Sequence, residues 1–189
     1  MNEAEARAEL RARQGAGARY DAPGAPARSL DLARRGTAYF ARLVNNLDDE
    51  ALSGSSRIDE KNRRWLIASI GLQARMLAES VGWARSNTAL DILPFHLTVD
   101  PAEIDLAATL PAQALRNLLA HSEVHLNVEW RDLTDDGWQL QVRDAVGNSM
   151  LITDTPLLRA RALWRTALEL DAGGRLADIP ALLRDAPSA

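Results

Sequence analysis

The sequence predicts a mainly α-helical fold, a four-helix bundle with a small β-hairpin before the fourth long helix. Four long segments place apolar residues at the spacing of one helix face, and none has a proline beyond its first turn. A short stretch between the third and fourth segments alternates polar and apolar residues around a turn-forming sequence. With 189 residues and 47% hydrophobic residues, the chain has the length and composition of one globular domain.

The first half of the chain contains an arm and two helices. Glycine and proline are frequent between residues 14 and 26, so residues 1–28 are predicted to form an irregular N-terminal arm and residues 29–189 the bundle domain. A first helix is predicted over 29–47, opened by a serine. A second is predicted over 59–85, where the polar sector is narrow, so this helix should be central in the bundle.

The second half begins with a long connection. Residues 87–110 contain two prolines and predict a loop with one helical turn near 102–104. A proline in the first turn favours a third helix over 111–133. Residues 138–142 alternate with period two, and residues 150–152 can return as the second strand of a hairpin.

The fourth helix has the clearest boundaries. Thr155 is a good N-cap, Pro156 suits the first helical position, and the pair Gly173 and Gly174 ends the helix. A short last helix is predicted near 179–184.

Composition excludes several classes of function. The net charge is −4 with scattered Lys and Arg, which disfavours nucleic acid as a partner. The sequence has no apolar run long enough for a membrane span and a charged N-terminus, so we expect a cytoplasmic protein. The absence of cysteine excludes disulfides and a cysteine nucleophile, so any thiol would come from a small molecule. A small-molecule substrate is the expected partner, and a homodimer is compatible with the sequence.

Two segments carry a resemblance to a known family. Residues 163–174, LWRTALELDAGG, and residues 125–133, HLNVEWRDL, resemble the thiol-dependent, mycothiol-type maleylpyruvate isomerase family of DinB-like metal-binding bundles. The resemblance covers roughly residues 29–180 and implies a DinB-like four-helix bundle. Relatives often continue into a smaller second domain that supplies a substrate-binding arginine, and we expect that contribution to be missing here.

The resemblance also implies where a metal would bind, and this sequence departs from the family there. The family's three ligands, two histidines and a glutamate, fall at Ser69, Ala162 and Thr166. A three-ligand site needs imidazole nitrogens and a carboxylate, whereas these residues offer a methyl group and two weak neutral hydroxyls. We therefore predict no metal. A low-molecular-weight thiol cofactor is implied by the resemblance alone, and no cofactor is predicted from the residues.

Two interpretations of the changed site remain. In the first, the vacated space is an apolar pocket in which a metal-independent enzyme isomerises or cyclises a small conjugated or carboxylic substrate, with His125 and Glu129 as acid and base. The expected lining is Trp65, Ser69, Met76, Ala162, Trp164 and Thr166, with Arg161 at the rim. In the second, the interior is resealed and the domain is a non-catalytic relative that binds a ligand or a partner subunit. The volume of the cavity distinguishes the two.

Two further clusters have two interpretations each. His121, His125 and Glu129 are spaced like an alternative metal site, or they are buried hydrogen-bonding residues that orient their helix. Three arginines, Arg159, Arg161 and Arg165, can bind a carboxylate substrate or an anionic thiol cofactor, or they form a solvated face paired with acidic residues.

Overall fold

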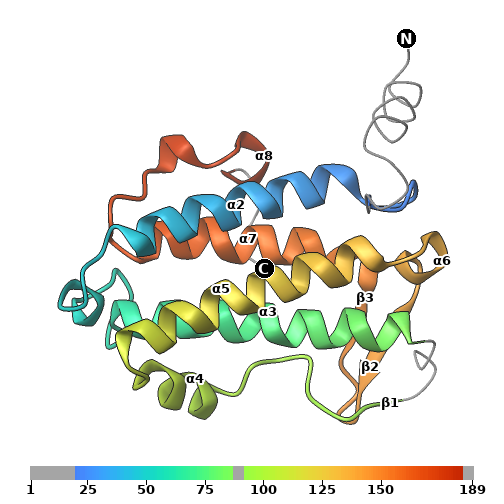
Figure 1. The fold of residues 1–189 in the computed structure, drawn as a ribbon, viewed down its shortest axis with the longest axis horizontal. Coiled ribbons are helices and arrows are strands. Elements are labelled where there is room, and N and C mark those ends of the chain that lie inside the picture. The colour runs from blue at the N-terminus through green and yellow to red at the C-terminus, as the bar shows by residue number, and fades with distance from the viewer. Residues whose placement is uncertain (1–19, 87–91, 185–189) are drawn as a thin grey trace.

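Four long helices form a bundle in the computed structural model, which describes residues 20–86 and 92–184 (Figure 1). They are α2 (Ala27–Asn45), α3 (Arg63–Arg85), α5 (Ala112–Asp132) and α7 (Thr155–Glu169). The predicted mainly helical bundle is confirmed. Most of the predicted N-terminal arm, residues 1–19, lies outside the described residues.

Shorter elements connect the helices. The single-turn helices are η1 (Ala51–Ser53), η2 (Ile152–Asp154) and η3 (Leu176–Asp178), and the short α-helices are α4 (Pro101–Ala108), α6 (Asp135–Trp138) and α8 (Ala181–Arg184). The connection over residues 87–110 was expected to contain one helical turn near 102–104. The structure shows a longer, eight-residue helix there, α4. It forms because Asp100 caps it by accepting a hydrogen bond from the Ala102 amide and Pro101 occupies its first turn.

The helices pack in two pairs. Helix α2 lies against α7, and α3 lies against α5, so that Figure 1 shows one pair above the other. Helices α3 and α5 run parallel: Gly71 faces Leu118, and Gly82, further along α3, faces Glu129, further along α5. Two consecutive long helices can be parallel only if the connection returns along their length. That returning segment carries α4, and it builds the groove described below.

The hairpin is present and slightly displaced from its predicted place. Strands β2 (Gln141–Asp144) and β3 (Ser149–Leu151) are antiparallel, and β1 (Ile92–Leu93) adds a parallel edge that the sequence did not predict. The turn between β2 and β3 places Gly147 at a φ of +93°, a conformation that glycine adopts without strain. The prediction that the first strand begins at residue 138 is wrong. Residues 135–138 instead form the short helix α6, which the Thr134 hydroxyl caps by accepting a hydrogen bond from the Gly137 amide, and Trp138 at its end is fully buried.

Local chemistry sets the start of α3. Glu60 has a φ of +63°, which is not helical, and the side chain of Asn62 accepts a hydrogen bond from the Trp65 amide. The helix therefore begins at Arg63 rather than at residue 59. No helix within residues 20–86 and 92–184 is both long and apolar enough to cross a membrane.

The core divides into two clusters along the bundle. One lies towards the hairpin and contains Trp130, Trp138 and Trp164, and the other contains Phe40 and Leu163 and lies towards the opposite end.

Candidate functional site

The three positions that we predicted to correspond to the family's metal ligands offer no suitable donors in the folded chain. Ala162 and Thr166 are buried on the same face of α7, one turn apart. Ser69 lies on α3, and its hydroxyl donates a hydrogen bond of 2.8 Å to the carbonyl of Leu66 in its own helix. In the part of the chain that the structure describes, no three His, Cys, Asp or Glu side chains come together to hold a metal ion. The residues present do not fit the metal that the resemblance implies.

A buried guanidinium lies in the same region. Arg159, one turn before Ala162, is completely buried. Its Nη1 donates to the Ile70 carbonyl at 2.8 Å and to Gln73 Oε1 at 2.7 Å, and its Nη2 donates to Glu123 Oε1. Because Gln73 is one turn after Ser69 on α3, the guanidinium is close to the positions aligned with the metal ligands.

All four long helices meet in this network. The Thr37 hydroxyl of α2 donates to Glu123 Oε2 at 3.0 Å, so the carboxylate of α5 is held from both sides. Burial lowers the pKa of Arg159, and the carboxylate of Glu123 opposes that shift. Arg159 therefore does not lie on the solvated face predicted for the arginines of α7. Arg161 is exposed, and exposed Arg165 lies 3.6 Å from Glu169.

The two tryptophans predicted to line an interior pocket lie in different places. Trp65 donates its Nε1 hydrogen to Asp105 on α4 at 2.8 Å, and the Lys61 ammonium lies 4.4 Å from its ring centroid. Trp164 donates to the Leu32 carbonyl at 3.0 Å and stacks on Tyr39 with 5.0 Å between the ring centroids. Trp65 thus belongs to the contact of α3 with α4, and Trp164 to the contact of α2 with α7.

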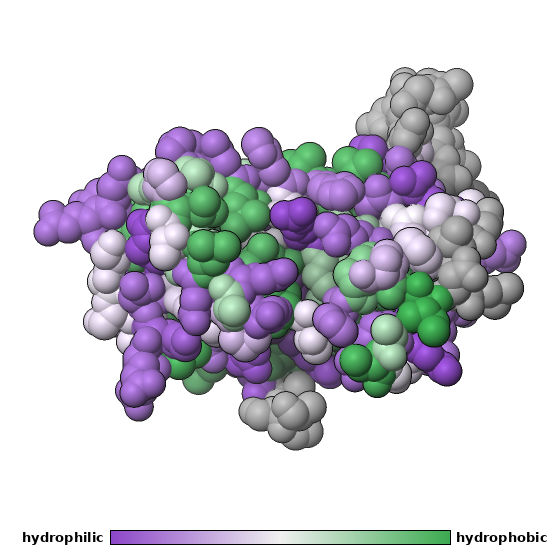
Figure 2. Space-filling model, turned by 90° about the horizontal axis from the view of Figure 1, so that it is seen from below, coloured by the Kyte–Doolittle hydropathy of each residue, from purple (hydrophilic) through white to green (hydrophobic). Residues whose placement is uncertain are grey.

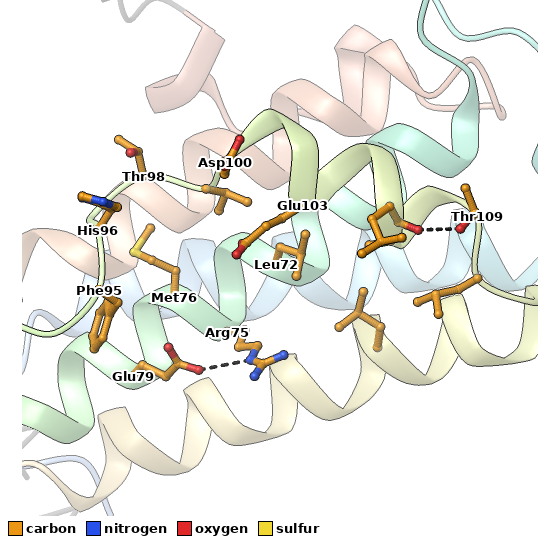
Figure 3. Close-up of a pocket in the computed structure, with 15 residues that line it drawn as sticks. Leu72, Arg75, Met76, Glu79, Phe95, His96, Thr98, Asp100, Glu103 and Thr109 are labelled. Carbon is orange, nitrogen blue, oxygen red and sulfur yellow. Dashed lines mark hydrogen bonds and ion pairs between the residues drawn. The ribbon is translucent and has the colours of Figure 1, made fainter.

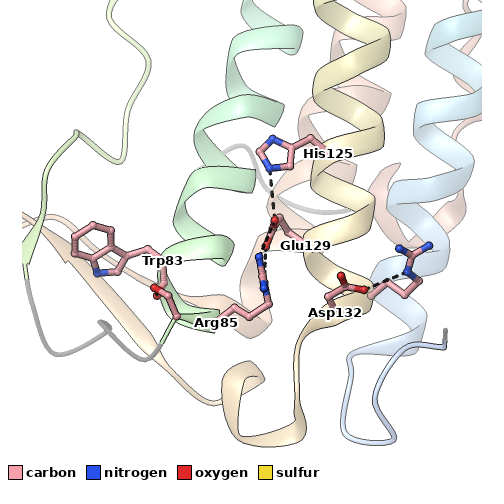
Figure 4. Close-up of polar contacts among 7 residues, drawn as sticks. Trp83, Arg85, His125, Glu129 and Asp132 are labelled. Atoms are coloured by element: carbon pink, nitrogen blue, oxygen red, sulfur yellow. Dashed lines mark hydrogen bonds and ion pairs between the residues drawn. The ribbon is translucent and has the colours of Figure 1, made fainter.

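The predicted acid and base are brought together at the hairpin end of α5 (Figure 4). His125 Nε2 lies 3.5 Å from Glu129 Oε1, and about half of the His125 side chain (52%) is exposed. Glu129 is buried, and Arg85 donates to both of its oxygens, at 2.9 and 3.2 Å. The hydrogen bond to Glu129 raises the pKa of Arg85. The prediction that His121 and His125 are buried is wrong, because both are exposed; within the described residues they also form no three-ligand group with Glu129.

An open groove lies between α3, α5 and the crossover segment with α4, and its volume is about 840 Å³. Its apolar lining consists of Leu72, Met76, Phe95, Val99, Leu106, Ala107, Leu110 and Leu118, and its polar lining of Arg75, Glu79, His96, Thr98, Asp100, Glu103 and Thr109 (Figure 3). Figure 2 views the molecule from the side of α4 and shows hydrophobic patches between hydrophilic side chains. Of the residues predicted to line a pocket, Met76 alone lines this groove.

The sequence contained signals for both features that were missed. Arg159, Ala162 and Thr166 share one face at spacing i, i+3, i+7, which distinguishes Arg159 from the outward Arg161. Leu72 and Met76 also share a face, at spacing i, i+4 on α3. Their partner was missed because the crossover was interpreted as mostly loop.

The parallel pair of central helices, the crossover between them and the hairpin before the last long helix define a DinB-like helical bundle. A family model described as the mycothiol maleylpyruvate isomerase N-terminal domain matches residues 33–170. The chain belongs to this family, as its sequence resemblance predicted.

Solved structures agree with this assignment. Crystal structures of the mycothiol-dependent maleylpyruvate isomerase and of a histidine-to-alanine mutant of it each share 31% sequence identity with this chain, with a TM-score of 0.73. Each match covers 82% of this chain and 65% of the other, so this chain spans less than two thirds of those relatives. No curated protein matches the chain. The DinB-like fold is confirmed.

Proposed function

We propose that this domain is a metal-independent, small-molecule-binding member of the maleylpyruvate isomerase family, and that its ligand binds in the groove between α3, α4 and α5. The groove carries the proposal. Its volume of about 840 Å³ is in the range of small-molecule sites, and it combines an apolar lining with a few charged groups. The region predicted to correspond to the family's metal site instead contains the buried hydrogen bonds of Arg159 to the Ile70 carbonyl and to Gln73.

Metal independence is supported by the donors at the aligned positions. A methyl group cannot bind zinc and neutral hydroxyls bind it poorly, and the nearby guanidinium of Arg159 would repel a zinc ion. We expect elemental analysis of the purified full chain to find no stoichiometric zinc after dialysis against zinc. The triple variant Ser69→His, Ala162→Glu and Thr166→His is the matched control, because it restores the family's ligand types on the same backbone. Stoichiometric zinc in the wild-type chain would overturn metal independence.

Binding in the groove can be tested with a variant that blocks it. Met76 is partly buried and lines the groove, so Met76→Arg places a long charged side chain there. In ligand-observed NMR with a set of small thiols, carboxylates, amines and aromatic alcohols, at least one compound should bind the wild type and lose binding to Met76→Arg. The matched control is Leu158→Arg, which makes the same type of change at an exposed position on α7. Equal binding to both variants would exclude the groove.

A second candidate function is favoured by the position of His125. It lies about two helical turns beyond Leu118, on the same face of α5, and Leu118 lines the groove. A half-exposed imidazole beside a carboxylate can transfer a proton to and from a substrate, as a metal-independent isomerase or cyclase requires. Because Arg85 holds Glu129, the proton carrier in this proposal is His125, and Glu129 orients it.

One variant distinguishes a catalytic domain from a domain that only binds its ligand. If the domain is an isomerase, His125→Ala should abolish conversion of a bound substrate while leaving its affinity unchanged, and His125→Gln should not restore turnover. If a compound binds in the groove and the wild-type chain converts neither that compound nor maleylpyruvate, with or without mycothiol, the non-catalytic ligand-binding alternative is favoured. The same assays test the thiol: we expect mycothiol to change neither binding nor turnover.

A further inference from the structure

The charged residues of the groove are mostly acidic. Among the described residues of the lining, Glu79, Asp100 and Glu103 contribute three carboxylates, and Arg75 contributes the one guanidinium. His96 lies at the rim, where its Nδ1 is 3.8 Å from the buried carboxylate of Asp144. In Figure 3, Arg75 and Glu79 come from α3, and Glu103 extends from α4 towards them.

The single guanidinium is already paired. Arg75 Nε donates to Glu79 Oε1 at 3.1 Å, an i, i+4 contact along α3. Asp100 accepts the capping hydrogen bond from the Ala102 amide. The side chain of Glu103, by contrast, forms no hydrogen bond or ion pair with any residue of 20–86 or 92–184, and Glu103 is exposed and lines the groove. Asp100 and Glu103 are therefore the two carboxylates of the lining without a cation beside them, and Glu103 is the one with no hydrogen-bond donor on its side chain.

Beside these charges lies an apolar surface. Leu72 and Met76 of α3, Phe95 of the crossover and Leu118 of α5 contribute to it. Methionine and phenylalanine adapt to flat or irregular apolar ligands. A ligand complementary to this arrangement has an apolar body for these side chains and a positive charge for Glu103.

We propose that the groove selects a small organic cation, an amine with an aromatic or aliphatic body, whose ammonium group lies beside Glu103. This inference rests on the proposed function, because it names the ligand class of the same groove. A dicarboxylate such as maleylpyruvate would place negative charge next to Glu103 and Asp100, and repulsion would weaken its binding. The ligand of the groove would then carry a charge opposite to that of maleylpyruvate, the substrate after which the relatives are named.

Three probes of similar size and different charge test the proposal: benzylamine, benzyl alcohol and benzoate. We expect NMR titration of the full chain at low salt to give affinities in that order, with benzylamine about tenfold tighter than benzoate. Glu103→Gln should weaken benzylamine about threefold and leave benzyl alcohol unchanged. Glu50→Gln is the matched control, since it removes the same charge from an exposed position outside the groove lining. Added salt should reduce the preference for benzylamine.

The outcomes distinguish the two proposals. Binding of all three probes with equal affinity, lost in Met76→Arg, would retain the groove as a site and overturn its charge selectivity. Preference for benzoate would overturn the selectivity as well. If no probe bound and the wider compound set also failed, the proposed function itself would fail. A further variant, Glu79→Gln, frees Arg75 and should therefore raise the affinity for benzoate.

Discussion

Removing the carboxylate of Glu123 should be among the most destabilising single changes in this chain. The Arg159 side chain is completely buried and that of Glu123 is 11% exposed, so Glu123→Gln leaves a cation in the interior without its counter-charge. Removing one partner of a buried pair costs about 3–5 kcal/mol. For a domain of this size each kcal/mol corresponds to about 2–4 °C, so the melting temperature should fall by about 6–20 °C.

The other variants of this series separate charge from packing. Replacing both residues, as Glu123→Leu with Arg159→Leu, should recover much of the loss, because apolar pairs of similar volume replace buried ion pairs with little cost. Thr37→Val removes one neutral donor to Glu123 and should cost about 1 kcal/mol. Arg161→Gln, at an exposed position two residues further along α7, should stay within about 0.5 kcal/mol of the wild type.

Equilibrium unfolding in urea, followed by far-ultraviolet circular dichroism, measures these free energies. The comparison requires that the free energy of unfolding falls with urea concentration at the same slope in each variant. A loss below about 1 kcal/mol for Glu123→Gln would refute the reasoning, because it would mean that the Arg159 charge is compensated by water or by its two other acceptors.

Three further changes have expected effects on stability. Arg85→Met should cost about 2–4 kcal/mol in urea unfolding, since it leaves the buried carboxylate of Glu129 without its bidentate partner. Gly36→Ala should lower the melting temperature, because the new methyl group would lie 2.9 Å from Nε1 of Trp164; this overpacking costs about 1–3 kcal/mol and exceeds the gain of up to 1 kcal/mol in helix propensity. Burial alone would raise the pKa of Asp144, but hydrogen bonds from backbone amides and a side chain lower it overall. The unfolded chain thus binds that proton more readily, stability falls as the pH drops below about 4, and Asp144→Asn should make this fall shallower in a pH series of thermal melts.

Local chemistry explains why most of the fold was predictable. Apolar periodicity identified the four long helices, but the capping signals did not place every end. The predicted N-cap Thr155 is already the first residue of α7, after Asp154 at the N-cap position, and α7 ends at Glu169, before the pair Gly173 and Gly174. Where the prediction failed, a tertiary contact or a cap prevailed over the pattern. Trp138 fits an alternating strand, but the cap at Thr134 and burial in the core make it helical.

The predicted site was harder to place, because it depends on which helices face each other. Trp65 and Met76 share an apolar stripe with Ser69, and that stripe predicts burial without naming its partner. The partner of Trp65 is Asp105 on α4, a helix that was expected to be a single turn. Likewise, three arginines in two turns are indistinguishable by composition, and the helical phase alone places Arg159 inside.

The buried network and the open groove are two consequences of the central place of α3. One side of this helix presents Gln73 and the Ile70 carbonyl to Arg159, and a neighbouring side presents Leu72 and Met76 to the groove. Because the parallel arrangement with α5 requires a returning crossover, the groove exists only when α3 and α5 are packed. Variants of the network should therefore change the free energy of unfolding but not the charge preference of a bound ligand. The charge variants of the groove, Glu79→Gln and Glu103→Gln, should do the reverse, so stability and ligand selectivity can be measured separately.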